Sequence, residues 1–133
     1  MPKSVVSALL SFEQRHTLVG NVIHLLETFR DDYFPDVATW ETLALVLILH
    51  RIIDINQLGR AANASALAWS TGMPRTTVRR KLTQLRKIGI IEKRGPSYLV
   101  SAAFMNRPNI LRGFKRRREM VWHLSKYLAE TAR

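Results

Sequence analysis

The chain has 133 residues, about the size of one domain, of which 47% are hydrophobic and 23% charged. This balance is typical of a globular protein and excludes a disordered chain. The chain contains no cysteine, which excludes a disulfide framework, a cysteine-ligated zinc site and a thiol nucleophile. Its formal net charge is +11.

The excess positive charge lies entirely in the second part of the chain. Residues 1–74 carry five basic and seven acidic side chains, a net charge of −2, whereas residues 75–133 carry sixteen basic and three acidic ones, a net charge of +13. A field this one-sided favours polyanions, either nucleic acid or an anionic membrane surface. The alternative is a basic surface that only keeps the protein soluble.

Neither export nor membrane insertion is indicated by the sequence. Residues 1–10 are too weakly apolar for a secretory signal. The longest apolar run, residues 43–49, ends at His50 and Arg51, far below the roughly 20 residues that a membrane helix needs. We therefore expect a soluble, cytoplasmic protein.

Two long helices are predicted in the first half of the chain. Apolar residues recur at helical spacing from about residue 5 to residue 30, and Asp31–Pro35 ends this amphipathic helix. Thr39 is the expected cap of a second helix, which is apolar nearly all round up to Ile53 and is therefore expected at the centre of the core. Residues 56–62 read as a loop.

A shorter helix, a turn and a third long helix follow. Asn63 or Ser65 can cap the short helix, which runs through Trp69 and ends before Gly72. Pro74 sits at the expected first position of the next helix, where its missing N–H is not needed. The apolar stripe of that helix, which Gly89 terminates, consists of Val78, Leu82, Leu85 and Ile88.

A hairpin and a final helix complete the predicted elements. Two short β-favouring runs, Ile90–Lys93 and Tyr98–Val100, flank a turn over residues 94–97. Pro108 opens the last helix.

This order of helix, short helix, turn, helix and hairpin resembles the winged helix-turn-helix fold. The resemblance is carried by Ala66–Leu82 (ALAWSTGMPRTTVRRKL), Leu85 and Gly89–Ile91, and it covers about residues 40–103. With an extra helix at each end, the chain resembles the MarR-type bacterial transcriptional regulators, whose terminal helices build a dimer. One departure is the wing: the family usually has Asp-x-Arg near the tip of a longer wing, where this chain has Glu92-Lys93-Arg94.

The resemblance implies a mainly α-helical fold with a small β-hairpin wing and a bacterial cytoplasmic location. Residues 37–105 would form the DNA-binding core, and the terminal helices within 1–36 and 106–133 would form the dimer. A small-molecule effector between the dimer helices and the core is compatible with this kind of protein, although the sequence does not locate it.

The third long helix is the predicted recognition helix. With its apolar stripe pointing inward, the opposite face carries arginines, a lysine and small hydroxyls, and nothing between Pro74 and Ile91 is acidic. Such a face suits the major groove of DNA. The predicted DNA-binding residues are Arg75, Thr76 and Arg79 at base edges, Arg80, Thr83 and Lys87 nearer the backbone, and Thr77 beside them.

Two other basic clusters allow alternative interpretations. Lys93 and Arg94 at the hairpin tip are predicted to contact a phosphate strand or the minor groove, although a plain surface turn has nearly the same sequence. Residues 115–118, Lys-Arg-Arg-Arg, point in different directions on a helix, so we expect some of them to approach flanking phosphates and others only to solvate the helix.

The end helices predict self-association. A core of about 65 residues cannot cover both of their apolar stripes, so apolar surface is left over. A two-fold dimer would place two recognition helices about 34 Å apart and select a pseudo-palindromic site. The alternative is that the end helices pack on each other within one chain. The predicted interface residues are Leu18, Val22, Leu25, Phe29, Phe114, Val121, Leu124 and Leu128.

Catalysis is not indicated. The four histidines lack metal-ligand spacing, and there is no Gly-rich phosphate loop or nucleophile elbow, so we expect neither an enzyme nor a metal or cofactor. Trp40, Trp69 and Trp122 are expected in the core or in an interface.

The leading hypothesis is therefore a homodimeric regulator that binds double-stranded DNA sequence-specifically. The alternative is a winged-helix module that binds protein and adheres to polyanions without sequence preference. Binding of structured RNA is a third reading, which the lack of an aromatic-rich strand for base stacking disfavours.

Overall fold

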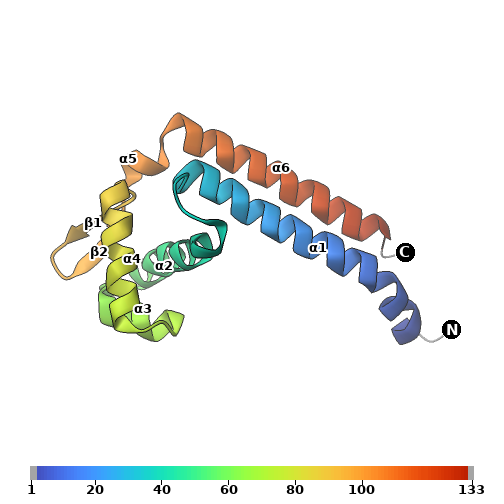
Figure 1. Ribbon diagram of the computed structural model, residues 1–133, viewed down its shortest axis with the longest axis horizontal. Helices are drawn as coiled ribbons and strands as arrows, with labels where there is room; N and C mark the ends of the chain where they lie inside the picture. The colour runs from blue at the N-terminus through green and yellow to red at the C-terminus, as the bar shows by residue number, and fades with distance from the viewer. Residues whose placement is uncertain (1–2, 132–133) are drawn as a thin grey trace.

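The protein consists of a small core and a long two-helix arm that extends from it (Figure 1). The computed structural model describes the backbone of residues 3–131 and the side chains of residues 12–131. The arm is made of α1 (Lys3–Tyr33) and α6 (Pro108–Thr131), which lie side by side although they come from opposite ends of the sequence. The core contains α2 (Thr39–Gln57), α3 (Ala64–Thr71), α4 (Arg75–Ile88), β1 (Ile91–Arg94), β2 (Ser97–Val100) and α5 (Ala102–Met105).

The predicted fold class, mainly α-helical with a small hairpin, is confirmed. β1 and β2 pair antiparallel, with Ile91 opposite Val100 and Arg94 opposite Ser97. Gly95 in the connecting turn has a φ of 57°, a conformation that glycine adopts at little cost. The structure describes no helix that is both long enough and apolar enough to cross a membrane.

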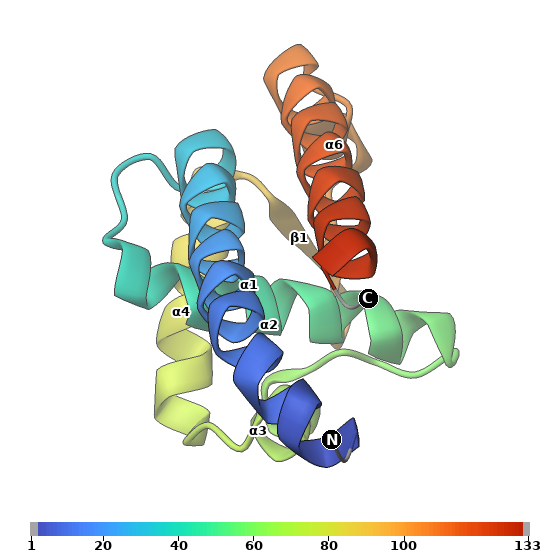
Figure 2. The same cartoon turned by 90° about the vertical axis from the view of Figure 1, so that its right-hand side faces the viewer.

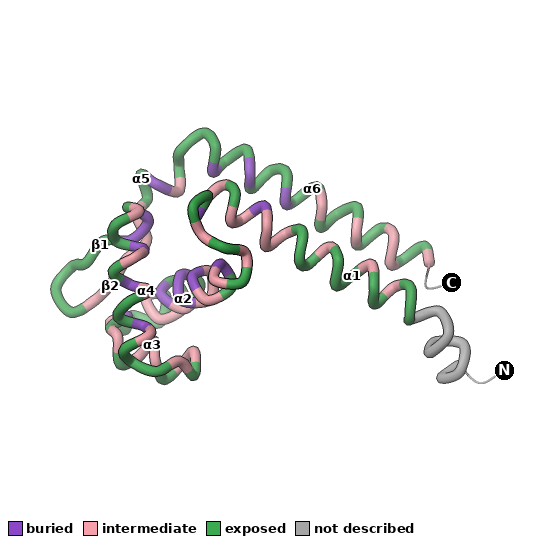
Figure 3. The backbone as a smooth tube through the Cα atoms, in the orientation of Figure 1, coloured by how far each residue is buried: buried purple, intermediate pink, exposed green. Residues whose placement is uncertain are grey.

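The hydrophobic core lies where α2, α3, α4, the hairpin and the base of the arm meet. Buried positions gather there, whereas positions toward the free end of the arm are half-buried or exposed (Figure 3). As predicted, α2 is central. The largest fully buried apolar side chains are Phe34, Leu45, Ile48, Ile52, Leu67, Leu82, Leu85, Ile90, Ile110 and Val78.

Local side-chain and backbone chemistry fixes the turn between α3 and α4. Asn63 caps α3, since its side-chain oxygen accepts a hydrogen bond of 2.8 Å from the N–H of Ala66. Gly72 ends α3 with a φ of 75°. The Thr71 hydroxyl then accepts a hydrogen bond from the N–H of Met73, which leads the chain into α4.

Four local predictions were wrong in detail. Helix α2 runs to Gln57, so Asn56 and Gln57 belong to it and not to the loop predicted over residues 56–62. The N-cap of α2 is Ala38, and Thr39 is the first helical residue, whose hydroxyl accepts a hydrogen bond of 2.7 Å from Arg30 Nη1. Pro74 is the N-cap of α4 and not its first helical residue. The short helix α5 was not predicted; Ser101 caps it by accepting a hydrogen bond from the N–H of Phe104.

Of the two places predicted for the tryptophans, the core and an interface, the core is wrong for all three. Trp40, Trp69 and Trp122 are all exposed, with exposed fractions of 78%, 89% and 59%. None of them contributes to the core, so each either lies against a partner or costs the protein an exposed aromatic ring.

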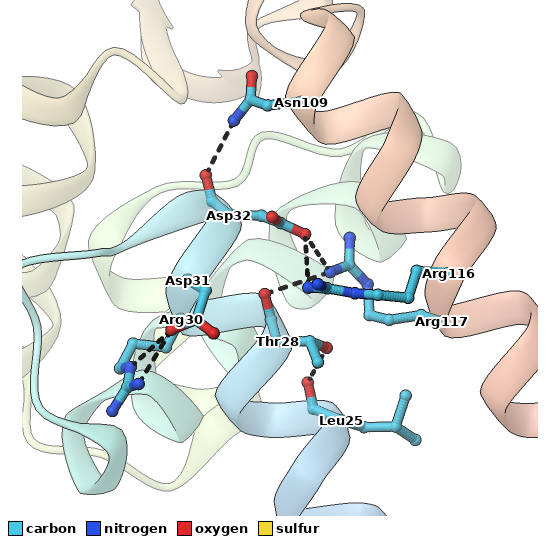
Figure 4. Close-up of polar contacts among 8 residues, drawn as sticks. All are labelled: Leu25, Thr28, Arg30, Asp31, Asp32, Asn109, Arg116 and Arg117. Carbon is cyan, nitrogen blue, oxygen red and sulfur yellow. Dashed lines mark hydrogen bonds and ion pairs between the residues drawn. The ribbon is translucent and has the colours of Figure 1, made fainter.

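A buried ion pair joins the two arm helices near their junction with the core (Figure 4). Arg117 on α6 is only 5% exposed, and its Nη1 donates hydrogen bonds to Asp32 Oδ2 at 2.6 Å and to the carbonyl of Thr28 at 3.3 Å. Its guanidinium group also stacks 4.2 Å from the centre of the Phe29 ring. The approach is close because Gly113 faces the carboxylate of Asp32 and has no Cβ.

The buried position of Arg117 corrects the reading of the 115–118 cluster, in which all four residues were treated as surface cations. Because Arg117 is enclosed between the arm helices, it cannot reach a phosphate. Lys115, Arg116 and Arg118 remain exposed, and Arg116 lies 3.8 Å from the carboxylate of Asp32. Farther along the arm, Gln14 donates a hydrogen bond of 2.8 Å to the hydroxyl of Thr131.

Candidate nucleic-acid interface

Helix α4 is amphipathic, with one face packed on the core and the other exposed. Val78, Leu82 and Leu85 are fully buried. The opposite face is solvent-exposed, as the sequence predicts, so that its basic and hydroxyl groups are accessible. The exposed residues of this face are Arg75, Thr76, Arg79, Arg80, Thr83, Arg86 and Lys87.

Two residues of α4 differ from this pattern. Thr77 is half-buried, so only part of its side chain is available. Lys81 turns toward α2, where its ammonium group lies 3.8 Å from the carboxylate of Glu41. The carboxylate of Glu41 therefore lies beside the flank of α4 and not beside its exposed face.

The first turn of α4 is tied to α3 by a hydrogen bond. Arg75 Nη2 donates to the hydroxyl of Ser65 at 2.6 Å. The guanidinium group of Arg75 is therefore already positioned, with its remaining N–H groups available to a ligand. Helical periodicity does not predict this contact, because the two residues are ten positions apart on different helices.

A polar hollow of about 530 Å³ lies between the start of α3, the exposed face of α4 and the hairpin. It brings together three side chains that the sequence analysis assigned to separate roles: Arg79 and Thr83 from α4, and Lys93 from the hairpin. The Thr83 hydroxyl donates a hydrogen bond of 3.0 Å to the carbonyl of Arg79. The other lining residues are Asn63, Ala64, Ser65, Pro96 and Tyr98.

The two basic residues of the hairpin are not equivalent. Arg94 pairs with Glu92 at 3.1 Å, so part of its charge is already neutralised. Lys93 instead lines the hollow, with its ammonium group 5.6 Å from the centre of the Tyr98 ring. The chemistry of the hollow, with two cations and a hydroxyl, matches a phosphate of a nucleic-acid backbone.

The predicted interface residues of the arm fall into two groups. Leu25, Phe29, Leu124 and Leu128 are half-buried between or beneath the helices, and Phe29 stacks on Tyr33 with ring centres 5.6 Å apart. The end helices thus do pack on each other within one chain, which was the alternative to a dimer. Leu18, Val22, Phe114 and Val121 nevertheless remain exposed.

Further apolar residues extend this exposed surface. On each arm helix they follow the inward-facing stripe by a quarter to half a turn in the same rotational sense. Because α1 and α6 run antiparallel, the residues offset by about a quarter of a turn lie on the same side of the arm, and those offset by nearly half a turn lie on the faces that point away from the other helix. The additional exposed residues are Phe12, Val19 and Ile23 on α1, and Leu111 and Trp122 on α6.

A second hollow, of about 410 Å³, lies where the arm joins the core. It is lined by aromatic residues, including Tyr33, Phe34 and Phe104, and by the charged groups of Asp32 and Arg107. It lies between the arm helices and the core.

Within residues 3–131 no group of three or more histidine, aspartate or glutamate side chains is arranged to hold a metal ion. No protein-family model, curated protein or solved structure matches the chain.

Proposed function

We propose that this protein is a homodimeric, sequence-specific double-stranded DNA-binding transcriptional regulator with a winged helix-turn-helix core of the MarR type. In this proposal α3 and α4 are the helix-turn-helix, α4 is the recognition helix, and the β1–β2 hairpin is the wing. The observation that carries the proposal is the exposed face of α4, which holds four arginines and a lysine but no carboxylate.

The dimensions of α4 suit the major groove of DNA. A helix with side chains is about 10–12 Å across, and the major groove is about 12 Å wide. The first turns of a recognition helix reach base edges, where an arginine can bond both acceptors of guanine. Thr76 and Arg79 are exposed in these turns, and Arg75 is held there by Ser65.

The hollow beside α4 supplies the contacts that position the helix. A phosphate in it would meet Arg79 and Lys93 from two different elements. Contacts of this kind fix the register of a protein on DNA without reading its sequence. Arg79 lies between the hollow and the exposed face, so it is the residue that links backbone contact to base reading.

The arm provides the dimer. Val22 and Val121 lie on the same side of it, and a second copy that covers this side would bury both. A two-fold dimer presents two α4 helices, which select two half-sites in opposite orientation.

The test is enrichment of bound duplexes from a random pool. We expect an inverted repeat with half-site centres about one DNA turn, roughly 34 Å, apart. A pool that stays random after several rounds, although the protein retains bulk DNA, would contradict sequence reading and support polyanion adhesion instead. Enrichment of a single, non-repeated site would contradict the dimer.

A further inference from the structure

A second exposed apolar site lies on the core, on the side of α3 away from the polar hollow. It is a groove of about 500 Å³ between the end of α2 and α3. Trp69 and Leu58 line it and are 89% and 71% exposed. The rest of its apolar lining is Ile55, Ala61 and Ala66. An indole group and a leucine left in water at one place mark a surface that binds a partner.

The charge at the edge of the groove restricts what the partner can be. Arg51 and Arg60 both line it. Arg51 is paired with Asp54 at 3.2 Å, but among the described residues Arg60 has no carboxylate within 4 Å. The complementary group is therefore an apolar side chain with a carboxylate beside it.

The free end of the arm carries such a pair. Phe12 is 76% exposed, and Glu13 next to it is exposed and, among the described residues, has no ion pair. In the same chain this end is far from the groove, because the arm extends away from the core (Figure 1). Figure 2, viewed from the free end of the arm, shows most of the segment that joins α2 to α3 to the right of α1 and below α6.

A second copy brings the two surfaces together. The apolar flank of α1 continues from Phe12 through Val19 and Val22 toward the base of the arm. If two arms pack antiparallel along these flanks, the free end of each lies beside the core of the other. From Phe12 to Tyr33 the helix is about 32 Å long, so each arm spans the distance from one core to the next.

We propose that Phe12 of one copy inserts into the Trp69–Leu58 groove of the other, with Glu13 paired to Arg60, and that two-fold symmetry repeats the contact. The inference rests on the dimer of the proposed function and adds a second, core-to-arm contact to it. This contact fixes how far apart the two α4 helices stand, since it holds each core at a set position along the other arm.

Disulfide trapping tests the contact directly, because the chain has no cysteine of its own. A Phe12→Cys protein mixed with a Ser70→Cys protein, whose new thiol lines the groove, should form a covalent heterodimer under mild oxidation. Phe12→Cys mixed with Thr83→Cys, which lies in the other hollow, should not. A native dimer that gives no Phe12–Ser70 cross-link would overturn the inference.

Two substitutions give an independent measurement by sedimentation. Trp69→Ala should raise the dimer Kd on the order of 100-fold, because two central aromatic anchors are lost per dimer. Trp40→Ala, which removes an exposed tryptophan outside the groove, should leave the Kd unchanged. Equal effects of the two variants would contradict the assignment of the groove.

Charge reversal distinguishes loss of the Glu13–Arg60 ion pair from a general loss of dimer stability. Glu13→Arg and Arg60→Glu should each raise the dimer Kd roughly tenfold, and combining them in one chain should restore it. No restoration would exclude the pairing. DNA binding is scored separately: a chain that cross-links but selects no duplex contradicts the proposed function alone, and selection without the cross-link contradicts only this contact.

Discussion

Gly113 is the position at which a single methyl group decides how closely the arm helices approach. A Cβ there would overlap the carboxylate of Asp32, which holds the buried Arg117. We expect Gly113→Ala to destabilise the fold by about 1–3 kcal/mol, although alanine is the better helix former, because the carboxylate must leave its partner. Chemical denaturation measures the change.

The matched control is Gly20→Ala on the other arm helix. Nothing lies within 4 Å of a Cβ at Gly20. The same substitution should therefore stabilise the protein by up to about 1 kcal/mol. If both substitutions stabilise the protein, helix propensity and not the Asp32 contact governs both positions.

Tyr33 gives the fold a pH dependence at alkaline pH. Burial raises the pKa of Tyr33; the charge of Arg117 opposes this rise and that of Asp32 adds to it. The unfolded chain therefore releases this proton first, above about pH 10. The stabilising contribution of Tyr33 is fully present below pH 10. The free energy of unfolding should fall as the pH rises from there through the raised pKa of Tyr33.

Denaturation curves between pH 9 and 11 would measure this fall. Tyr33→Phe should abolish the part due to Tyr33, whereas Tyr127→Phe should retain it. If the Tyr33→Phe curve keeps the full slope, the alkaline loss of stability comes from elsewhere.

At the scale of elements, the sequence predicts those features that residues within one or two turns of a helix determine. The stripe of Val78, Leu82 and Leu85 fixes the inner face of α4 and so its outer face, and Asn63 and Gly72 fix the ends of α3, because each acts within one turn of chain. Four-residue α5 is too short to show a period. It was therefore missed.

Contacts between distant segments could not be predicted. Arg117 reads as one of four consecutive surface cations, and only its contact with Asp32, 85 positions earlier, explains its burial. The meeting of Arg79 with Lys93 likewise depends on how the hairpin folds against α4. Helical periodicity also cannot tell a tryptophan that packs inside the chain from Trp69, which does not.

The hairpin should contribute to DNA affinity but not to sequence preference. Lys93→Ala should weaken binding to every duplex about equally and lower the salt slope of binding by about one phosphate contact, because Lys93 lines the hollow. Arg94→Ala should have a smaller effect, since Arg94 is paired with Glu92. A loss confined to one sequence would make Lys93 a base-reading residue.

At the scale of the whole molecule, charge and shape act together. The basic second part of the chain should bind DNA with a strong salt dependence, because each neutralised phosphate releases counterions. With about six phosphate contacts, affinity should fall by about 10³-fold between 50 and 200 mM salt. An isotherm that does not change over this range would contradict electrostatic binding to a phosphate backbone.

The central claim is that the exposed face of α4 reads base pairs, and the most direct measurement compares two arginines of that helix on two duplexes. Arg79 lies in the second turn, whereas Arg86 lies in the last turn. On the selected duplex Arg79→Ala should cost about 1–3 kcal/mol more than on a scrambled duplex, where only the phosphate contact of Arg79 in the hollow is lost; Arg86→Ala should affect both duplexes alike. Equal losses on the two duplexes for Arg79→Ala would contradict sequence reading by α4.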